Sequence, residues 1–361
     1  MIWGRRLFLL FLAALFWLPA LPSRPALAAT APVNITVSPM PVLLSAKPGS
    51  SLNYNLRVQN SGTADTKLRV DLYKFGANGS TGQPQLSKPG PGDDFTNWVS
   101  FSPAIFDAPP NVWINVNLSI KPPKDAAFGY YFAAVFSPAS PQLTTKSNSN
   151  TIQGAAAILV LLDVNAPGEK RQLSTVSLTT DKKVYEYLPV KFSIKVRNTG
   201  NVHASPAGDI FISKGNGPAI ATLDINPAQG NILPGTTRSF DITWTDGFPV
   251  FQYNKKNDVV ATDKKGNPIY KLNWDFSKVN KFRFGHYTAH LLLTYDNGSQ
   301  DIPVNGYVSF WVIPWKLMLI VMLVVLAILT GLVMMLRGGF KRASRLKKKL
   351  KKTDRGEKPK I

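Results

Sequence analysis

The sequence predicts an all-β protein: two immunoglobulin-like β-sandwich domains in tandem, followed by a single transmembrane α-helix. Three observations support this prediction. Between residues 33 and 311, apolar and polar residues alternate in short runs separated by Gly, Pro, Asn and Asp, a pattern typical of strands and turns in a sandwich. Two motifs of the first half recur in the second half. An uncharged run of twenty residues, 317–336, follows the second copies of the motifs.

The first repeated motif is an alternating strand that ends in V-x-N-[ST]-G. It reads LNYNLRVQNSG at 52–62 and VKFSIKVRNTG at 190–200. Asn and Gly suit a turn that needs left-handed backbone angles, and an Asn side chain can also bond its own backbone. The motif therefore predicts the same strand and turn in both domains.

The second repeated motif is Gly-x-Tyr at the start of a late strand, FGYYFAAVF at 128–136 and FGHYTAHLL at 284–292. This pattern is typical of the tyrosine corner of immunoglobulin-like domains, so Tyr131 and Tyr287 are the expected corner residues. The two motifs lie about eighteen residues farther apart in the second half. We expect the extra residues in an inserted β-hairpin near 248–282, around a Lys-Lys-Gly-Asn turn.

The ends of the chain predict export and membrane attachment. Arg5 and Arg6, the apolar run after them and Ala-Leu-Ala before residue 29 have the pattern of a cleaved signal peptide. The apolar stretch 155–164 is too short to span a bilayer, so we interpret it as a strand buried on both faces. The predicted organisation is a signal peptide (1–28), a first sandwich (29–165), a linker (166–172), a second sandwich (173–312), a transmembrane helix (315–336) and a basic cytoplasmic tail (337–361).

The uncharged run has the length of a membrane span. Twenty helical residues cover about 30 Å, the thickness of the hydrocarbon core. Lys- and Arg-rich flanks stay cytoplasmic, and Trp side chains favour the membrane interface. Trp311 and Trp315 on one side and Arg337 on the other are therefore the expected interface anchors. The predicted location is the plasma membrane, as a single-pass protein with its N-terminal domains extracellular.

Charge and cysteine content narrow the functional classes. The chain has a net charge of +21 and no cysteine, but the tail 337–361 alone contributes twelve Lys and Arg against Asp354 and Glu357. This concentration predicts contact with anionic inner-leaflet lipid and argues against nucleic-acid binding. The absence of cysteine excludes thiol catalysis. In exported domains of this size it indicates a prokaryotic surface protein stabilised by its cores alone.

Catalytic and metal-binding patterns are absent from the sequence. His286 and His290 share a face of a predicted strand, but at about 3.3 Å per residue they lie roughly 13 Å apart, too far for one metal ion. There is no nucleophile elbow, no phosphate-binding loop and no pair of carboxylates at a usable spacing. We therefore expect no enzyme activity, no catalytic residue, no metal and no cofactor.

Aromatic residues are the remaining candidates for a binding surface. Trp113 lies between the core positions Val112 and Ile114, so it should face outward. Tyr253, Tyr270 and Trp274 lie in or near the inserted hairpin. Two interpretations stay open: these side chains form a partner surface, or they cover a thin edge of the sandwich.

The overall layout resembles the WxL-interacting proteins of Gram-positive cell surfaces. The resemblance is most detailed in two segments, ITVSPMPVLLSAKPGSSLNYNLRVQNSG (35–62) and FDAPPNVWINVNLSIKPPKDAAFGYYFAAVF (106–136). In that family the first domain is thought to engage peptidoglycan and the second a host or partner protein, so the resemblance implies a wall-associated binding role. The N-terminal half is also similar to the N-terminal domain of pilus-assembly chaperones. The shared motifs are of low specificity, so no binding residue is carried over.

The functional expectation is a non-enzymatic, membrane-anchored cell-surface binding or scaffold protein. Its two domains would be presented to a cell-wall polymer or to another surface protein. The alternatives are an accessory subunit of a secretion, pilus or transport complex, and a sensor that relays extracellular binding to the tail. Gly331 is the only glycine within the span, so a GxxxG packing motif that would favour a membrane complex is absent.

Overall fold

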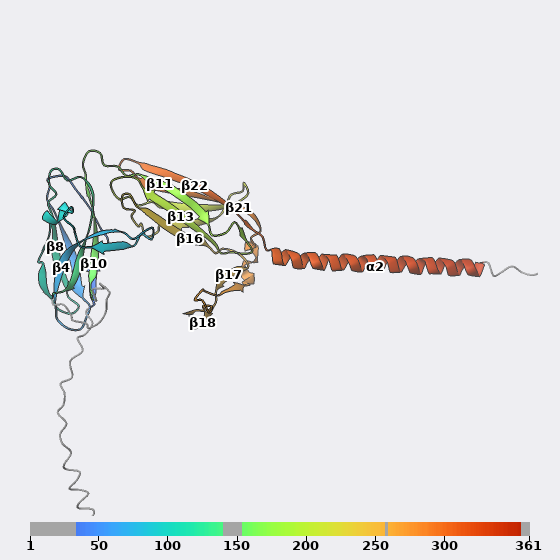
Figure 1. The fold of residues 1–361 in the computed structure, drawn as a ribbon. Coiled ribbons are helices and arrows are strands. Elements are labelled where there is room, and N and C mark those ends of the chain that lie inside the picture. The colour runs from blue at the N-terminus through green and yellow to red at the C-terminus, as the bar shows by residue number, and fades with distance from the viewer. Residues whose placement is uncertain (1–33, 140–153, 257–258, 355–361) are drawn as a thin grey trace, which may run out of the picture.

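The chain folds into two β-sandwiches followed by one long helix, as seen in a computed structural model (Figure 1). The structure describes residues 34–139, 154–256 and 259–354. The expected signal peptide and the last residues of the basic tail lie outside these ranges. The predicted fold class, two immunoglobulin-like sandwiches and a C-terminal apolar helix, is confirmed.

The first sandwich is built from two facing sheets, ordered β1-β3-β8-β6 and β2-β10-β9-β4-β5, with β7 also paired to β4. Strand β10 runs parallel to β2 and antiparallel to β9. The elements are β1 (Ile35–Ser38), β2 (Val42–Ala46), β3 (Leu52–Asn60), β4 (Thr66–Ala77), β5 (Pro84–Ser87), the short 3₁₀ helix η1 (Asp94–Asn97), β6 (Val99–Ser102), β7 (Ile105–Ala108), β8 (Trp113–Ile120), β9 (Phe128–Pro138) and β10 (Ala156–Val164).

Strand β10 is buried on both faces, as its continuous apolar run predicts. Ile158, Val160 and Leu162 point into the core between the two sheets. Leu161 points to the other face and joins a second apolar cluster, against which Leu233 of the second sandwich packs. Because one sheet of the first sandwich is apolar on both faces, the second sandwich covers part of its outer face.

The repeated Asn of the V-x-N-[ST]-G motif has the same structural role in both domains. The Asn60 side-chain amide donates to Ala64 O and Ala108 O, and its carbonyl accepts from Gly62 N–H. Asn198 makes the equivalent three bonds, with Val202, Ile232 and Gly200. Neither Asn has a positive φ, so left-handed backbone geometry does not explain these positions. The motif instead supplies a fully hydrogen-bonded buried amide that joins a strand end to two neighbouring segments.

The second sandwich pairs the sheet β11-β13-β16 with the sheet β12-β22-β21-β14-β15, and it carries two small added sheets, β17-β20 and β18-β19. Its elements are β11 (Leu173–Thr180), β12 (Val184–Tyr185), β13 (Val190–Asn198), β14 (Ala207–Lys214), β15 (Ala219–Ile225), β16 (Thr237–Trp244), β17 (Val250–Tyr253), β18 (Lys255–Lys256), β19 (Val259–Val260), β20 (Tyr270–Asn273), the 3₁₀ helix η2 (Phe276–Lys281), β21 (Gly285–Asp296) and β22 (Asp301–Val312). The added sheets lie within the segment where the sequence predicts an inserted hairpin.

The core of the second sandwich is aromatic at the end nearest the C-terminal helix. Trp244, Tyr287 and Phe310 are almost completely buried. The Trp244 ring makes edge contacts with both of the others, with ring centroids 5.6 Å and 6.2 Å apart, and Tyr287 stacks on Phe310 at 5.8 Å. The Arg283 guanidinium lies 5.5 Å from the Trp244 ring centroid. Large rings therefore close this end of the core, where the sheets meet the helix.

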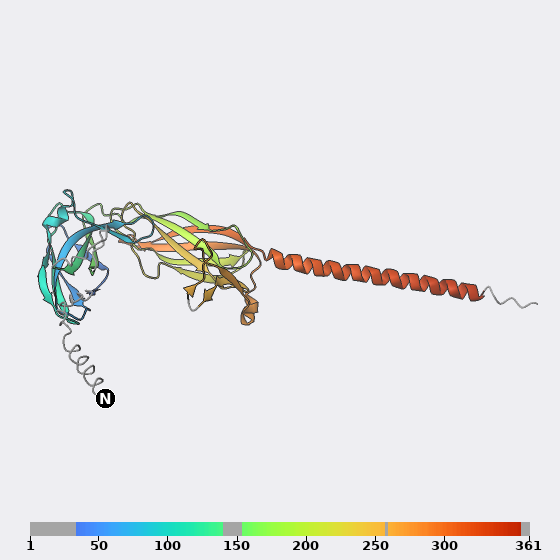
Figure 2. The same ribbon diagram turned by 60° about the horizontal axis from the view of Figure 1, so that its bottom comes forward.

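Helix α2 (Trp315–Asp354) continues directly from the second sandwich. Its apolar part has the length and composition of a membrane span, and none of it is buried against the rest of the protein (Figure 2). The Ile313 N–H donates to Tyr185 O at 2.7 Å, and the Lys316 ammonium contacts the Glu186 carboxylate at 2.9 Å. The helix extends beyond the predicted end at 336 because Lys, Arg, Ala and Leu in the basic tail are all good helix formers.

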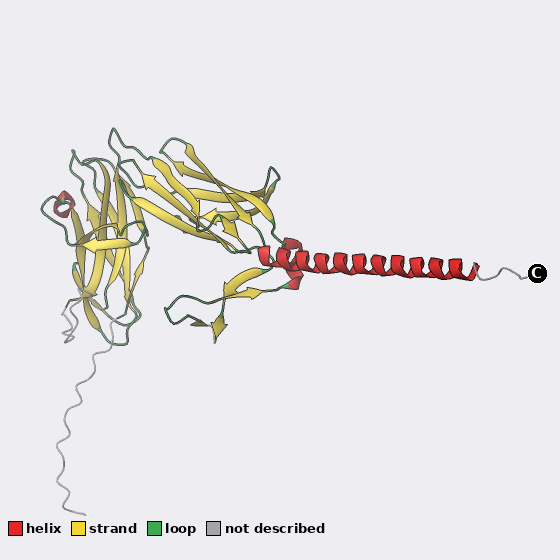
Figure 3. Cartoon of the chain, turned by 45° about the vertical axis from the view of Figure 1, so that its right-hand side comes forward, coloured by secondary structure: helices red, strands yellow, loops and turns green. Residues whose placement is uncertain are grey.

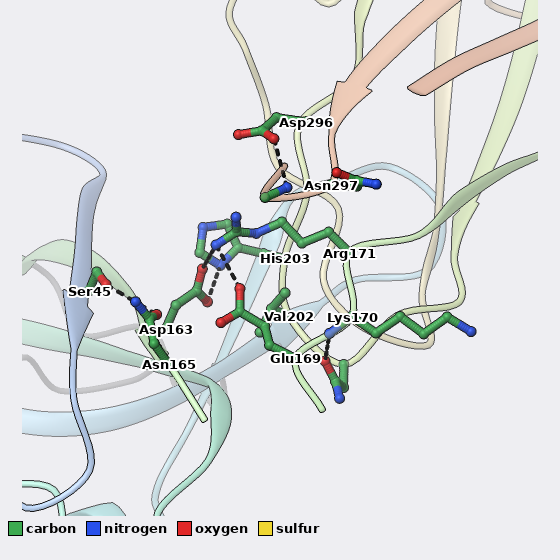
Figure 4. A network of polar contacts seen from close by, with 12 residues as sticks. Ser45, Asp163, Asn165, Glu169, Lys170, Arg171, Val202, His203, Asp296 and Asn297 are labelled. Atoms are coloured by element: carbon green, nitrogen blue, oxygen red, sulfur yellow. Dashed lines mark hydrogen bonds and ion pairs between the residues drawn. The ribbon is translucent and has the colours of Figure 1, made fainter. Parts of the chain in front are cut away.

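A polar network joins the two sandwiches (Figure 4). The buried Asp163 at the end of β10 contacts Arg171 Nη2 at 3.1 Å and His203 Nδ1 at 3.0 Å. Asn201 holds the linker, because Lys170 N–H donates to its side chain and Asn201 N–H donates to Lys170 O. Gly200 permits this approach, since a Cβ there would lie 2.1 Å from Lys170 O. The linker 166–172 is therefore fixed against the second domain.

Replacing Trp244 with Ala should destabilise the second sandwich by about 3–5 kcal/mol, because it leaves a large cavity in a closed core. Trp244→Phe should cost less than Trp244→Ala, because it leaves a smaller cavity and the indole N–H has no hydrogen-bond partner to lose. Guanidinium denaturation of the full chain in detergent, followed by near-ultraviolet circular dichroism, measures both. Tyr307→Ala, at a side chain that is 76% exposed, is the control. An equal loss in all three variants would contradict this account.

Replacing Asp163 with Ala should loosen the contact between the sandwiches, because Arg171 then loses one of its two carboxylate partners, the other being Glu169, and His203 loses its neighbouring carboxylate. Nitroxide labels at Ile105→Cys and Val176→Cys, both exposed, report the interdomain distance by pulsed electron resonance. The distribution should broaden in the Asp163 variant. It should not broaden in the control Asp107→Ala, because the Asp107 side chain is 84% exposed. Unchanged width in both would refute the role of the network.

Candidate functional site

The main candidate site is a cleft of about 450 Å³ in the second sandwich. One wall comes from the segment 181–191, which contains β12 and the start of β13. The other wall is the inserted hairpin, through Phe251 of β17 and Tyr270 of β20. We call this feature the hairpin cleft. It is lined by Asp181, Lys182, Val184, Tyr185, Glu186, Tyr187, Pro189, Lys191, Phe251 and Tyr270.

A phenol–carboxylate pair forms one end of the hairpin cleft. The Tyr185 hydroxyl donates a short hydrogen bond to the Asp181 carboxylate and accepts one from Lys182 N–H at 3.0 Å. The same carboxylate accepts from Lys191 N–H at 3.3 Å. Burial and the nearby Asp181 charge raise the pKa of Tyr185 well above its usual range. Tyr185 is therefore a fixed neutral donor, and Asp181 holds the loop in place.

Two tyrosines and a lysine form the exposed rim of the cleft. Tyr253 and Tyr270 are direct partners in the β17–β20 ladder, and their ring centroids lie 5.0 Å apart. The neighbouring Tyr253 hydroxyl lowers the pKa of Tyr270, and the nearby Tyr270 raises the pKa of Lys191. Tyr253 and Tyr270 are 46% and 40% exposed. The rim thus offers two ring faces, hydroxyl groups and one ammonium to a ligand.

Aromatic packing joins the hairpin to the sandwich. The buried Tyr187 makes edge contacts with Phe251 at 6.0 Å and with Trp274 at 6.4 Å. Trp274 packs in turn on the buried Phe248 at 5.7 Å. Phe251 N–H donates to Leu188 O at 2.8 Å. These contacts fix the hairpin to the sandwich, and Phe248 is buried between them.

The hairpin also leaves one strand edge open. The β17–β20 sheet has two strands, and within the described residues β20 has β17 as its only strand partner. The other side of β17 approaches Leu188. The outer edge of β20 therefore presents backbone N–H and C=O groups with no strand paired to them, next to the tyrosine rim. Such an edge can accept an extended polypeptide as an added strand.

The predicted partner-surface residues separate into two regions. Tyr253 and Tyr270 are direct strand partners on the hairpin, and Trp274 directly follows β20 and packs on Tyr187 and Phe248. Trp113 lies in the first sandwich at the start of β8, is 38% exposed, and has the Arg57 guanidinium 4.7 Å from its ring centroid. Its neighbour Val112 precedes the strand and is exposed, in contrast to the predicted core position. The four aromatic residues therefore do not form one continuous surface.

The two expected tyrosine corners have different surroundings. The Tyr287 hydroxyl accepts a hydrogen bond from Phe284 N–H at 3.0 Å, the backbone contact typical of a corner. Tyr131 instead points to the outer face of its sheet, with its ring 5.9 Å from that of His203 in the second sandwich. Burial raises the pKa of Tyr131 strongly. The tyrosine of the shared Gly-x-Tyr motif therefore lies in the core in the second domain and at the contact between the domains in the first.

The predicted interface anchors lie on either side of the apolar run. Trp311 on β22 is 47% exposed and stacks near His286, with ring centroids 4.8 Å apart. Trp315, the first residue of α2, is 56% exposed. Arg337 lies within α2, beyond the apolar run. Their roles at the membrane interface stay predictions, as does the orientation of the span.

Sequence reasoning missed a second cleft, of about 430 Å³, between the two sandwiches. Its walls include Phe75 and Leu161 from the first sandwich and Leu233 and Arg238 from the second. Arg238 is partly buried there and donates to Asn231 O at 3.1 Å. A Cβ at Gly82 or Gly230 would lie within 2.5 Å of its guanidinium. No local pattern reveals this cleft, because its walls come from two different domains, far apart in the sequence.

Among the described residues, no group of three His, Cys, Asp or Glu side chains lies close enough to hold a metal ion. His286 and His290 lie on β21, where His286 contacts Trp311 and His290 lines a shallow surface depression. The chemistry that the hairpin cleft offers is hydrogen bonding and aromatic stacking.

Comparisons with known proteins show distant similarity to two-domain β-sandwich proteins. No protein-family model and no curated protein sequence matches the chain. Among solved structures, the class 5 fimbriae chaperone CfaA has 14% identity over 75% of this chain and 97% of its own, with a TM-score of 0.36. The Pseudomonas aeruginosa CupB2 chaperone has 10% identity over 77% and 100%, with a TM-score of 0.33. A PapD-like domain of human CEP192 has 11% identity over 41% and 92%, with a TM-score of 0.24. Similarity at this level does not assign a function.

Removing the Tyr287 hydroxyl tests the corner contact. Tyr287→Phe should destabilise the second sandwich by about 1–3 kcal/mol, because Phe284 N–H loses its acceptor. The expected signal is a lower midpoint in thermal unfolding of the full chain in detergent. Tyr295→Phe, at another buried tyrosine of β21, is the matched control and should change the midpoint less. A larger shift in the control would show that the Tyr287 hydroxyl is not a structural contact.

Proposed function

We propose that the chain is a non-enzymatic, membrane-anchored binding protein that captures an extended segment of a partner protein at the hairpin cleft. One observation carries the proposal: the open edge of β20 lies beside an exposed rim formed by Tyr253, Tyr270 and Lys191. Backbone groups at a free strand edge give affinity to an extended partner, and neighbouring side-chain pockets give specificity.

The composition of the cleft supports the same proposal. Tyrosine rings offer a large contact area at a low entropic cost, and they are enriched at protein interfaces. Asp181, Glu186, Lys182 and Lys191 add charges of both signs around the aromatic floor. A polypeptide with alternating side chains fits a surface of this kind, because one face can enter the cleft while the other stays in water.

The membrane anchor and the first sandwich complete the proposed role. Helix α2 would hold the protein in the cytoplasmic membrane with both sandwiches outside, where a surface protein or the cell wall is within reach. The resemblance to WxL-interacting proteins supports a surface location. Trp113 on the first sandwich would be a separate contact, for a cell-wall polymer. The alternative of an accessory subunit in a membrane complex predicts a partner bound through α2 and not through the cleft.

The variant Tyr253→Ala/Tyr270→Ala should lose partner binding at least about tenfold, because removing two central aromatic contacts typically costs more than 1.4 kcal/mol. The full chain in detergent would be immobilised and incubated with a detergent extract of surface proteins, and separately with isolated cell walls. Bound partner would be identified and its affinity for each variant measured. The two tyrosines are exposed, so both sandwiches should keep their thermal midpoints.

Tyr307→Ala is the matched control, because Tyr307 is an exposed tyrosine on β22 that does not line the cleft. Its binding should equal that of the unmodified chain. Equal binding by the double variant would exclude the hairpin cleft as the partner site. Binding to bare wall that depends on Trp113, and not on the two tyrosines, would identify a wall polymer as the ligand instead.

A further inference from the structure

A second exposed apolar surface lies on the segment 274–284, next to the hairpin cleft but outside it. We call this segment the foot. Its large apolar side chains point to solvent, with exposed fractions from 42% to 71%. An exposed apolar patch of this kind in so short a segment marks an interaction surface. The side chains are Trp274, Phe276, Val279, Phe282 and Phe284.

The foot is rigidly built, so its exposed side chains are held outward by the fold. The Asp246 carboxylate is contacted by both Lys281 and Arg283, and Arg283 Nε also donates to Asp246 O at 2.9 Å. Phe248 N–H donates to Lys281 O at 3.0 Å. Asp275 caps η2 by accepting from Ser277 N–H. The segment is therefore an ordered element attached to the core of the second sandwich.

The foot lies at the end of the sandwich from which the membrane helix leaves. The last residue pair of the β21–β22 ladder is Gly285 with Val312. The foot ends one residue before Gly285, and α2 begins three residues after Val312. Figure 3 shows η2 beside the start of α2, and Figures 1 and 2 place it at the same end of the domain. A bilayer crossed by α2 would therefore begin close to the foot.

The charges on the foot suit a lipid headgroup region. It contains the exposed Lys278 and Lys281 against a single acid, Asp275, whereas Arg283 is only 14% exposed and turns inward to Asp246. Lys316 in the first turn of α2, which contacts Glu186, is a further exposed cation. Aromatic and aliphatic side chains combined with Lys and Arg are the composition of segments that lie in the membrane interface. Trp274, Trp311 and Trp315 supply the indole rings that favour this depth.

We infer that the foot inserts Phe276 and Val279 into the membrane leaflet nearest the second sandwich, with Lys278 and Lys281 among the lipid phosphates. The partner is the bilayer that α2 crosses, so the inference rests on the anchor in the proposed function and not on the ligand of the cleft. Two contacts with the membrane, α2 and the foot, prevent the second sandwich from swivelling about a single attachment. The hairpin cleft is thereby held at a fixed height and direction above the lipid surface.

Site-directed spin labelling of the full chain tests the inference, because the chain contains no cysteine. Val279→Cys would be labelled with a nitroxide and reconstituted at one chain per nanodisc, in equal parts of phosphatidylcholine and phosphatidylglycerol. Collisions with a water-soluble nickel chelate and with oxygen report lipid burial. At position 279 the nickel collision rate should be at least about threefold lower than at Val259→Cys. Val259 is 70% exposed on β19, which pairs with β18, and Figure 1 shows β18 away from α2.

A nitroxide at Leu326→Cys, in the middle of the apolar run, tests whether α2 spans the membrane independently of whether the foot enters it. Shielding at 326 and 279 with exposure at 259 supports the inference. Shielding at 326 alone overturns it and leaves the anchor intact. Exposure at 326 overturns the anchor and with it the inference. One chain per nanodisc ensures that shielding comes from lipid and not from a second copy or another protein.

A charge placed on the foot provides a second readout. Phe276 is 71% exposed, so Phe276→Asp should fold normally. It should raise the nickel collision rate at position 279 to about that at position 259, because a carboxylate resists entry into the interface. Ile269→Asp introduces the same charge on the hairpin and should leave position 279 shielded. Continued shielding of position 279 in Phe276→Asp would overturn the inference that Phe276 inserts the foot into the lipid.

Discussion

The twelve-residue ladder between β21 and β22 is the constraint on which the second half of the structure depends. Its inner face contributes Tyr287 and Phe310 to the aromatic end of the core, where they meet Trp244. Its last pair, Gly285 with Val312, also determines where the foot and α2 leave the domain. The same hydrogen-bonded element therefore closes the core and sets the geometry of the membrane attachment. A long antiparallel ladder can do both, because a shift of one residue would move every core side chain to the wrong face.

The inserted segment between β16 and β21 converts a sandwich edge into two distinct surfaces. One side carries the rim of Tyr253 and Tyr270, facing the segment 181–191 across the hairpin cleft. The other side carries the foot, whose apolar side chains point away from the core. Asp246, directly after β16, supports the foot, because it holds both Lys281 and Arg283. A partner surface and a lipid surface on one insertion would link the orientation of the cleft to the membrane.

The contact between the two sandwiches rests on buried polar groups together with one apolar face. Asp163 lies near the end of a strand that is buried on both sides, so its carboxylate needs partners from outside the first sandwich. Arg171 supplies one partner from the linker, and His203 supplies another from the turn after the repeated Asn motif. The outer face of β10 adds Leu161, against which Leu233 is packed. Arg238, enclosed by two glycines, completes the boundary of the interdomain cleft.

Local patterns in the sequence determined the sandwich class, the strands, the insertion and the apolar helix, because alternation and uninterrupted apolar length depend only on neighbouring residues. They also pointed to Tyr253, Tyr270 and Trp274 as exposed aromatic side chains. Tertiary structure decided the rest. It separated Trp113 from the hairpin and gave Tyr131 and Tyr287 different surroundings. It revealed the buried role of Asn60 and Asn198, and it placed the foot beside α2. Each of these outcomes depends on contacts between segments far apart in the chain, and such contacts leave no periodic signal in the sequence.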